Sequence, residues 1–460
     1  MRRLLLATTA LLGFAVGPAL ADTRFEARLA GQAVLPAATF IQPPADAPEY
    51  FRISGRFTGP GNARVEQPGS RPSVSLPGYG DRPTGLALPF QGQPVQGFSG
   101  IKPAGDGSYW VTSDNGFGNR RNSADALLYL FRIRPNWQTG QVAVERSIAL
   151  SDPNRVAPFP IMTEATATRY LTGADFDIES IQPLPDGSFL IGDEFGPYLL
   201  HVDAEGRLLR IIETTLDGQV LRTPDHHANM IPANPTQGVG FRVRRSGGYE
   251  GLALTPDGRT AWALMEQPLF APNSAEPEGA FLRVLEFDVT RMAWTGRSLR
   301  YRLEPGATAI GDFNFIDERR ALVIERDNGE GDPSRACAQG QTSTHQNPCF
   351  AMPARFKRVY LVDMGAVDAE GFVRKIGHID LMAIRDPERI ARQRGDRAPG
   401  ADDTVFTFPF FTIENVAMVD QDHIIVGNDN NLPFSAGRHL TRADDNELIL
   451  LHVPEFLRAR

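Results

Sequence analysis

The strongest constraint on the fold is a strand, turn and strand pattern that the chain repeats. The clearest copy spans residues 177–196, where two apolar strands flank Pro185-Asp186-Gly187 and acidic residues stand at the start of the first strand and the end of the second. Glycine supplies the positive φ that such a tight turn needs, so the pattern predicts a β-hairpin. Four more copies are legible, at residues 97–116, 249–267, 310–329 and 413–431.

Each predicted hairpin is followed by further strands. A third stretch of alternating apolar and aromatic residues follows every copy, and a fourth, more polar strand follows the first four, as at residues 207–214 and 297–303. Four antiparallel strands that recur at a period of roughly 60 to 100 residues are typical of β-propeller blades with inserted loops.

A strand near the N-terminus would supply the strand that the last predicted blade lacks. The fifth copy stops after its third strand, while an unassigned strand stands alone near residues 25–35. Joining the two would remove the exposed sheet edges. Residues 41–96 are rich in proline and glycine and could form a degenerate sixth blade. We therefore predict an all-β chain: a single β-propeller of five to six four-stranded blades, closed by an N-terminal strand that completes the last blade.

The first 21 residues have the features of a secretory signal peptide. Met1-Arg2-Arg3 precedes an apolar run that ends near Val16, which is too short to span a bilayer, and Ala19-Leu20-Ala21 resembles a cleavage site. We expect cleavage after Ala21, no stable membrane anchor afterwards, and a mature propeller domain at residues 22–460 that is periplasmic or secreted.

The net charge limits which partners the chain is expected to bind, and the cysteine content indicates its compartment. A formal net charge of -8 argues against a nucleic-acid partner, because no basic face is expected to neutralise phosphates. Cys337 and Cys349, the two cysteines of the chain, lie in one polar stretch. A disulfide between them would fix an exposed loop inserted in the fourth legible blade, which suits an oxidising compartment.

Equivalent positions of the repeats carry acidic residues. The first strand of each propeller blade lines the central channel, so the start of these strands would form a ring of Ser99, Glu179, Glu250, Asp312 and Glu414. In the fourth copy the register is open, and Ile310 or Gly311 can hold the equivalent position instead. Carboxylates in one narrow channel repel one another and raise one another's pKa values unless a cation neutralises them.

A second acidic set follows the second strands, and it includes Asp114, Glu325 and Asp429. Ligands from Asp, Glu and Asn without Cys or His indicate a hard cation, and calcium tolerates an irregular cage better than magnesium does. Acids at strand ends also cap turns, which is the ordinary role of any single one of them. The recurrence at the start of the inner strands favours a calcium site, with predicted ligands Glu179, Glu250, Glu414, Asp312, Asp114, Glu325 and Asp429.

Candidate catalytic residues lie near the same strand ends. Ser99 is not in a Gly-x-Ser-x-Gly elbow, so the sequence contains no serine nucleophile motif. Asp193 and Glu194 can activate water, and Arg326 can hold a phosphate beside a metal. His226 stands in a long loop between blades, where it can act as acid, base or ligand at the channel mouth. A solvated loop histidine and a salt-bridged arginine are the alternatives.

These motifs resemble the phytase-like family of secreted bacterial proteins, also described as having esterase-like activity. The resemblance covers residues 97–453 and is carried by residues 177–181, 192–196, 248–253 and 323–327. The Glu then Ser or Gly opening of the inner strands is also similar to the metal-binding strand of calcium-dependent propeller lactonases, which implies that Glu179, Glu250 and Glu414 are cation ligands.

The leading hypothesis is a calcium-dependent hydrolase of phosphate esters, in which the metal replaces a protein nucleophile. A carboxylic-ester or lactone hydrolase that uses the same metal is the near alternative. The third is a non-catalytic periplasmic propeller in which the acids hold a structural ion and its faces bind a ligand or protein. For either enzyme we expect a monomer that acts on a small-molecule ester or phosphoester.

Overall fold

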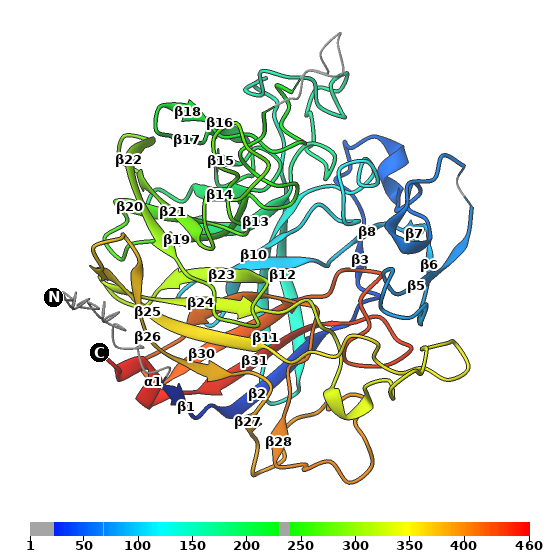
Figure 1. Cartoon of the computed structure of the whole chain (residues 1–460). Coiled ribbons are helices and arrows are strands. Elements are labelled where there is room, and N and C mark those ends of the chain that lie inside the picture. Colours follow the sequence, from blue (N-terminus) through cyan, green and yellow to red (C-terminus); the bar gives the residue numbers. More distant parts are fainter. Residues whose placement is uncertain (1–22, 68, 230–239) are drawn as a thin grey trace, which may run out of the picture.

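In the computed structural model, which describes residues 23–67, 69–229 and 240–460, the chain forms a β-propeller (Figure 1). Five four-stranded antiparallel blades are present in these ranges. The inner strands are β9 (Phe98–Pro103), β13 (Ile178–Pro183), β19 (Tyr249–Leu254), β23 (Ala309–Phe315) and β29 (Thr412–Met418). The second strands are β10 (Tyr109–Ser113), β14 (Phe189–Asp193), β20 (Thr260–Met265), β24 (Arg320–Arg326) and β30 (His423–Asp429).

The third and outer strands complete the blades. The third strands are β11 (Tyr129–Asn136), β15 (Tyr198–Val202), β21 (Leu282–Asp288), β25 (Lys357–Val367) and β31 (Asn446–His452). The outer strands are β12 (Gln141–Ala149), β16 (Leu208–Glu213), β22 (Ala293–Tyr301), β26 (Val373–Asp380) and β2 (Arg28–Leu35). The inner strands pack in the closed order β9, β13, β19, β23, β29 and back to β9.

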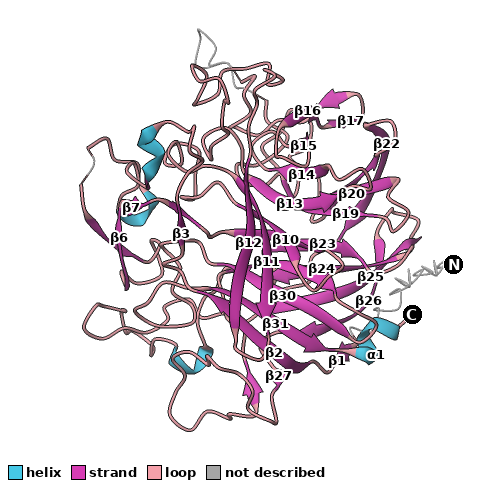
Figure 2. Ribbon diagram, turned by 180° about the vertical axis from the view of Figure 1, so that it is seen from behind, coloured by secondary structure: helices cyan, strands magenta, loops and turns pink. Residues whose placement is uncertain are grey.

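The N-terminal strand closes the ring as predicted. β2 pairs antiparallel with β31, with Leu35 opposite Asn446 and Arg28 opposite His452. Figure 1 shows this blue strand beside the red C-terminal strand. The other side of β2 meets β12 through one bridge, so the last and first blades form one continuous sheet, visible from behind in Figure 2. The predicted fold class is confirmed.

The count of blades is five, because residues 41–96 do not form a sixth. They lie mainly over one end of the propeller, at the right of Figure 1, and make three two-stranded ladders with neighbouring strands. These ladders are β3 (Phe40–Ile41) with β8 (Gln93–Pro94), β4 (Ile53–Ser54) with β7 (Phe90–Gln91), and β5 (Arg71–Val74) with β6 (Pro83–Leu88). Prolines and glycines interrupt the segment too often for longer strands.

The remaining regular elements are short. They are β1 (Arg24–Phe25) beside β26, the pair β17 (Thr215–Leu216) and β18 (Gln219–Val220), the pair β27 (Ile384–Arg385) and β28 (Val405–Phe406), the 3₁₀ turns η1 (Glu49–Arg52), η2 (Pro60–Asn62) and η3 (Pro333–Arg335), and helix α1 (Pro454–Arg458). None of the helices in the described ranges is long and apolar enough to cross a membrane. The predicted signal peptide at residues 1–21 lies outside the described residues.

Apolar residues from neighbouring blades meet in five clusters, one between each pair of blades. Ile324 of β24 and Val426 of β30, for example, belong to the same fully buried cluster. Burial of apolar area holds adjacent blades together, and this is the main stabilising contribution in such a ring.

The connections differ in length at the two ends of the propeller. Inner and second strands are joined by short hairpin turns at one end, whereas long segments follow β10, β20, β24 and β30 at the other. One of these segments contains the predicted disulfide, which is formed: Cys337 and Cys349 are bonded, with their Cα atoms 4.9 Å apart. The long connections and residues 41–96 therefore surround the end where second strands finish and inner strands begin.

Candidate functional site

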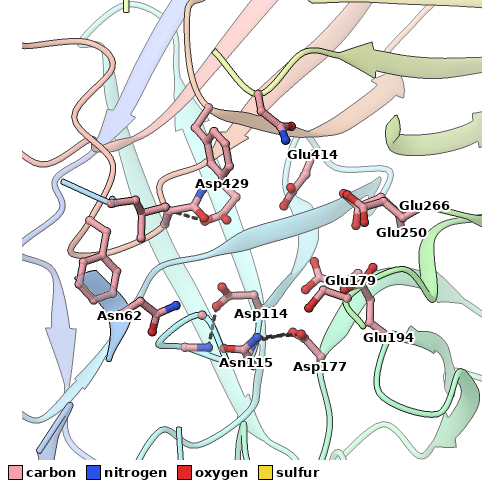
Figure 3. A pocket seen from close by; sticks show the side chains of 18 of the residues that line it. Asn62, Asp114, Asn115, Asp177, Glu179, Glu194, Glu250, Glu266, Glu414 and Asp429 are labelled. Atoms are coloured by element: carbon pink, nitrogen blue, oxygen red, sulfur yellow. Dashed lines mark hydrogen bonds between the residues drawn. The ribbon is translucent and has the colours of Figure 1, made fainter. Parts of the chain in front are cut away.

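A cavity of about 360 Å³ opens at the end of the propeller that carries the long connections. We call it the acid cavity, because eight of the described residues that line it are carboxylates: Asp114, Asp177, Glu179, Glu194, Glu250, Glu266, Glu414 and Asp429. In Figure 3, Glu179, Glu194, Glu250 and Glu266 are gathered on one side and Asp429 and Asn62 lie on the other.

Three of these acids occupy the same position on three inner strands, and a β-bulge aims each of them inward. Ile178 is opposite Asp193 and Ser180 is opposite Gly192, so Glu179 is the extra, unpaired residue. The pairing of β19 skips Glu250 in the same way, and that of β29 skips Glu414. A bulge redirects a side chain away from the regular alternation of a strand, which here turns each glutamate into the channel.

The other two inner strands carry no acid at this position. Counted from the end of the hairpin, Ser99 of β9 holds the equivalent position, although the bulge of this strand falls one residue later, at Gly100. The Ser99 hydroxyl donates to Glu414 at 2.9 Å. In β23 the equivalent residue is Gly311, where a Cβ atom would lie 1.8 Å from the carbonyl oxygen of Ile413. The close approach of the β29 backbone therefore excludes any side chain, and the ring of acids is interrupted at this blade.

A second ring follows the ends of the second strands. The residues one position beyond the aligned ends of the hairpins are Asp114, Glu194, Glu266, Arg326 and Asp429. All five line the acid cavity. The repeat thus supplies two tiers of side chains to one space, and the fourth blade contributes an arginine where the other four contribute acids.

One blade adds a further carboxylate. Asp177 lies just before β13, two residues ahead of Glu179, and accepts hydrogen bonds from Asn115 through both its backbone N (3.0 Å) and its Nδ2 (2.7 Å). Carboxylate oxygens of Asp177, Glu179 and Glu194 all lie within 4.8 Å of one another. This is the tightest acidic group of the cavity, and three ligand oxygens at that spacing can surround one cation.

Arg326 is the cation that faces these acids among the described lining residues. Its Nη2 donates to Glu266 Oε1 at 3.0 Å and lies 3.6 Å from Glu414 Oε1, while Nη1 donates to Asn328 Oδ1 at 2.9 Å. Only 5% of the residue is exposed. The arginine is therefore held rigidly, but one positive charge cannot balance eight carboxylates.

The electrostatic consequence appears in the acid pKa values. Burial first, and then the neighbouring carboxylates, raise the pKa values of Glu179, Glu194 and Glu250 well above the ordinary glutamate value. The same causes raise the pKa of Asp114 to about 8. Without a cation, the cavity would have to hold several of its acids protonated near neutral pH.

The donor chemistry fits a hard divalent cation. Glu194 Oε1 and Glu250 Oε1 are buried and have no hydrogen-bond partner within the described part of the chain. Unpartnered buried carboxylate oxygens are costly and are found mainly where an ion or water completes them. The immediate ligand set of Asp177, Glu179 and Glu194 contains oxygen only, which favours calcium or magnesium over softer metals.

The profile of a protein family described as "Phytase-like: Esterase-like activity of phytase" matches residues 93–432. The chain belongs to this family. An uncharacterized secreted protein of Arthroderma benhamiae is 27% identical over 190 residues, which are 37% of this chain and 32% of that protein. The chain thus matches about a third of the relative's length.

Solved propeller structures with similar folds are distant in sequence. A periplasmic gluconolactonase of Pseudomonas aeruginosa is 14% identical, covers 80% of this chain and 77% of its own, and gives a TM-score of 0.29. The calcium-binding protein regucalcin of Agrobacterium tumefaciens is 11% identical, covers 77% and 91%, and gives a TM-score of 0.34.

In this phytase-like protein, five of the seven predicted metal ligands line the acid cavity and two do not. Asp312 is one residue past the equivalent position, and it accepts hydrogen bonds from the backbone N of Val416 (2.8 Å) and from Asn314 Nδ2 (3.1 Å). Glu325 points to the opposite side of β24 from Arg326. It accepts from the Tyr301 hydroxyl at 2.6 Å and pairs with Lys375.

Of the four predicted catalytic residues, two line the acid cavity and two do not. Glu194 and Arg326 line the cavity, whereas Asp193 accepts backbone hydrogen bonds from Asp177 N (2.8 Å) and Gly196 N (2.7 Å) and holds the local turn. His226 lies in a separate pocket beside β16, where its Nε2 is 3.6 Å from Glu213 Oε1. The structure does not place His226 at the mouth of the acid cavity.

Two lining acids, Asp177 and Glu266, were absent from both the predicted metal ligands and the predicted catalytic residues. Asp177 lies outside the repeat, because the equivalent residues of the other blades are Gly97, Gly248, Ala309 and Thr412, so no recurring pattern marks it. Glu266 does have a signal, since it follows its second strand as Glu194 and Asp429 follow theirs.

Proposed function

We propose that this phytase-like protein is a secreted hydrolase of phosphate esters that depends on a divalent cation, with calcium as the preferred ion. The observation that carries the proposal is the acid cavity itself: eight carboxylates face one buried arginine, and two of the carboxylates have an unpartnered buried oxygen. Such a cavity is compatible with ionised acids only when cations are bound.

The group formed by Asp177, Glu179 and Glu194 is the proposed primary cation site. Glu250 and Glu414 project from the neighbouring positions of the inner ring and can complete the coordination. Calcium accepts six to eight oxygens in irregular arrangements, whereas magnesium demands a near-octahedral cage. Ligands from three blades and five separate positions suit the more tolerant ion.

Ester polarisation, phosphate binding and proton transfer are the other functions that hydrolysis requires. Calcium bound there would polarise the ester and offset the charge of an anionic substrate. Arg326 presents a guanidinium whose Nε has no partner among the described residues, and a phosphoryl oxygen is a suitable acceptor. Glu250 Oε1 can accept the proton of the attacking water as the water oxygen bonds to phosphorus, and it can return that proton to the leaving oxygen as the ester P–O bond breaks and the alcohol departs.

Secretion is supported by two observations. The Cys337–Cys349 disulfide persists best in an oxidising compartment, and the relative from Arthroderma benhamiae is named as a secreted protein. The signal peptide expected at residues 1–21 would provide the route.

The carboxylic-ester or lactone alternative is favoured by one feature. Because acids outnumber the arginine in the cavity, a neutral substrate enters without the repulsion that a phosphate meets. The two enzyme classes therefore differ in how many cations must bind before the substrate does.

The test uses the mature chain, residues 22–460. Metal content is measured by inductively coupled plasma mass spectrometry. Hydrolysis of p-nitrophenyl phosphate, bis-p-nitrophenyl phosphate, short p-nitrophenyl acyl esters and a γ-lactone is then measured with calcium and with chelator. We expect calcium in the purified protein and chelator-sensitive phosphate ester hydrolysis.

Each other outcome has a definite meaning. Hydrolysis of acyl esters or lactone alone would replace the phosphate proposal with the alternative. Bound calcium without hydrolysis would indicate a non-catalytic binding propeller. Absence of any bound divalent ion, with an unchanged melting temperature on chelation, would overturn the cation site, because a ligand specific for the native state must stabilise it.

A further inference from the structure

A second cavity, of about 750 Å³, opens beside the first and has the opposite charge. We call it the arginine pocket. Its charged lining residues are Arg56, Arg64, Arg120, Arg121 and Asp175, and the remainder of its wall is largely apolar. Four arginines in one concavity are unexpected in a chain with a formal net charge of -8.

Two of the arginines are fixed by carboxylates and stack on aromatic rings. Arg56 donates from its backbone N (2.9 Å) and Nε (3.2 Å) to Asp125, which leaves its two terminal nitrogens without a hydrogen-bond partner among the described residues. Arg64 pairs with Glu66, and its guanidinium lies 4.8 Å from the centre of the Phe57 ring. These contacts hold the guanidinium groups in place before any ligand binds.

The other two arginines form no ion pair within the described ranges. Arg120 donates Nε to the carbonyl oxygen of Ala174 (2.9 Å) and Nη1 to that of Asp225 (2.5 Å), so it is oriented by backbone groups that do not neutralise it. The guanidinium of Arg121 is exposed and makes no hydrogen bond or ion pair there. Both charges remain available to an anion.

The wall of the pocket offers apolar area next to these charges. Tyr50 is 38% exposed and Met162 is 50% exposed, which is high for large apolar side chains in a folded protein. Phe57 and Ile161 line the same space. A ligand that fits must therefore combine an apolar or aromatic body with a negative charge, since either part alone would leave half of the lining unused.

The arginine pocket and the acid cavity share a wall but no charged residue. Asn62 and Gly118 line the acid cavity, whereas Arg64 and Arg120, each two residues further along the chain, line the arginine pocket. Asn62 is held in this wall by Asn122 Nδ2, which donates to its side-chain oxygen at 2.7 Å. The two spaces can consequently bind ligands independently.

We propose that the arginine pocket is a second ligand site, which binds organic anions that carry one phosphate, carboxylate or sulfonate on an apolar or aromatic body. Arg120 and Arg121 contact the anionic group, Arg56 contributes its free terminal nitrogens, and Phe57 with Met162 covers the body of the ligand. The site does not depend on calcium or on the hydrolytic activity proposed above.

The test measures binding of naphthalene-1-sulfonate to the calcium-loaded mature protein by isothermal titration calorimetry. A sulfonate is a poor ligand for calcium, so this probe separates the arginine pocket from the acid cavity. Methanesulfonate supplies the same anionic group without the aromatic body, and 1-naphthol supplies the body with a neutral hydroxyl. We expect naphthalene-1-sulfonate to bind about tenfold or more tightly than either comparator.

Variants locate the binding. Arg121→Gln and Phe57→Ala should each weaken sulfonate binding by about fivefold to tenfold, whereas Arg259→Gln, the same charge change at the exposed β19–β20 turn, should leave it unchanged. Glu179→Gln should also leave it unchanged, even though it alters the acid cavity. Circular dichroism and melting curves confirm that Arg121→Gln and Phe57→Ala are folded.

The following results would contradict the proposed second site. No measurable binding of the sulfonate, or equal losses in Arg121→Gln and Arg259→Gln, would overturn the arginine pocket as a specific site. Binding that is lost in Glu179→Gln and retained in Arg121→Gln would move the ligand to the acid cavity, and it would refute the second site while leaving the hydrolase proposal intact.

Discussion

Replacing Glu179 with glutamine should change the stability of the protein in opposite directions with and without calcium. The substitution keeps the shape of the side chain and removes one charge from the group with Asp177 and Glu194. In the chelated protein it relieves repulsion, and in the calcium-loaded protein it removes an anionic ligand. A residue with a purely structural role would not produce this reversal.

The size of both effects follows from the geometry. The carboxylates of the group lie within 4.8 Å of one another. At an effective dielectric constant of about 20, two unit charges at that separation repel by about 3.5 kcal/mol. Protonation limits this repulsion, because holding a glutamate neutral at pH 7 costs about 3.7 kcal/mol relative to its ordinary pKa. We therefore expect Glu179→Gln to stabilise the chelated protein by about 1 to 3 kcal/mol.

The loss with calcium is of similar size. Removing one direct ligand should weaken binding by at least about 100-fold, the upper range for a residue that only supports a ligand. At saturating calcium this lowers the stabilisation by about 2.7 kcal/mol. For roughly 430 ordered residues the entropy of unfolding is about 0.9 kcal/mol per kelvin, so each kilocalorie shifts the melting temperature by about 1 °C.

The assay is a set of four melting curves, wild type and Glu179→Gln, each in 1 mM calcium and in chelator, with calcium affinity from titration calorimetry. The rise in melting temperature caused by calcium should be at least about 3 °C smaller in the variant. Glu325→Gln is the matched control, because the Glu325 carboxylate pairs with Lys375 outside the acid cavity. It should lower both melting temperatures equally. Wild-type calcium affinity in Glu179→Gln, with no gain in chelator, would refute the cation site.

Three further changes test other parts of the molecule. Arg326→Gln should lower kcat/KM for p-nitrophenyl phosphate by about 100-fold while calcium content is retained, and an unchanged rate would exclude Arg326 from phosphate binding. Burial lowers the pKa of His227 from 6.5 to about 3, so the unfolded chain takes up a proton that the native chain refuses and stability falls as the pH drops below 6.5. In urea titrations, His227→Gln should therefore lose about 2 kcal/mol less between pH 7 and pH 5, and parallel losses would contradict this origin. Replacing Cys337 and Cys349 together with serine should lower the free energy of unfolding by about 2 to 3 kcal/mol without loss of calcium, and calcium loss would show that the loop shapes the site.

The sequence predicted the propeller because the signals are local and repeated. Each hairpin has its own turn glycine, and the unpaired strand near residues 25–35 has one natural partner in the incomplete last blade. The sixth blade considered for residues 41–96 was wrong, since a composition rich in proline and glycine does not distinguish degenerate strands from a cover of short ladders.

The acid cavity was predictable only in part, because bulges and close backbone contacts decide which residues face it. Alternation along a regular strand does not reveal that Glu179, Glu250 and Glu414 are each the unpaired residue of a bulge. It also cannot distinguish Glu325 from Arg326, which point to opposite sides of β24. Asp312 was predicted as a ligand because it is the acid nearest to the expected register, yet the equivalent residue is Gly311.

The departure of the fourth blade from the repeat gives the cavity its polarity. Gly311 removes an acid from the inner tier because the backbone of β29 passes too close for any side chain, and Arg326 replaces an acid in the outer tier of the same blade. Both changes lower the negative charge on one side of the cavity. The tightest acidic group, Asp177 with Glu179 and Glu194, belongs entirely to the second blade. A cation is therefore drawn toward the second blade and an anionic group toward the fourth. A substrate that spans the two would be oriented by the broken symmetry before any chemistry occurs.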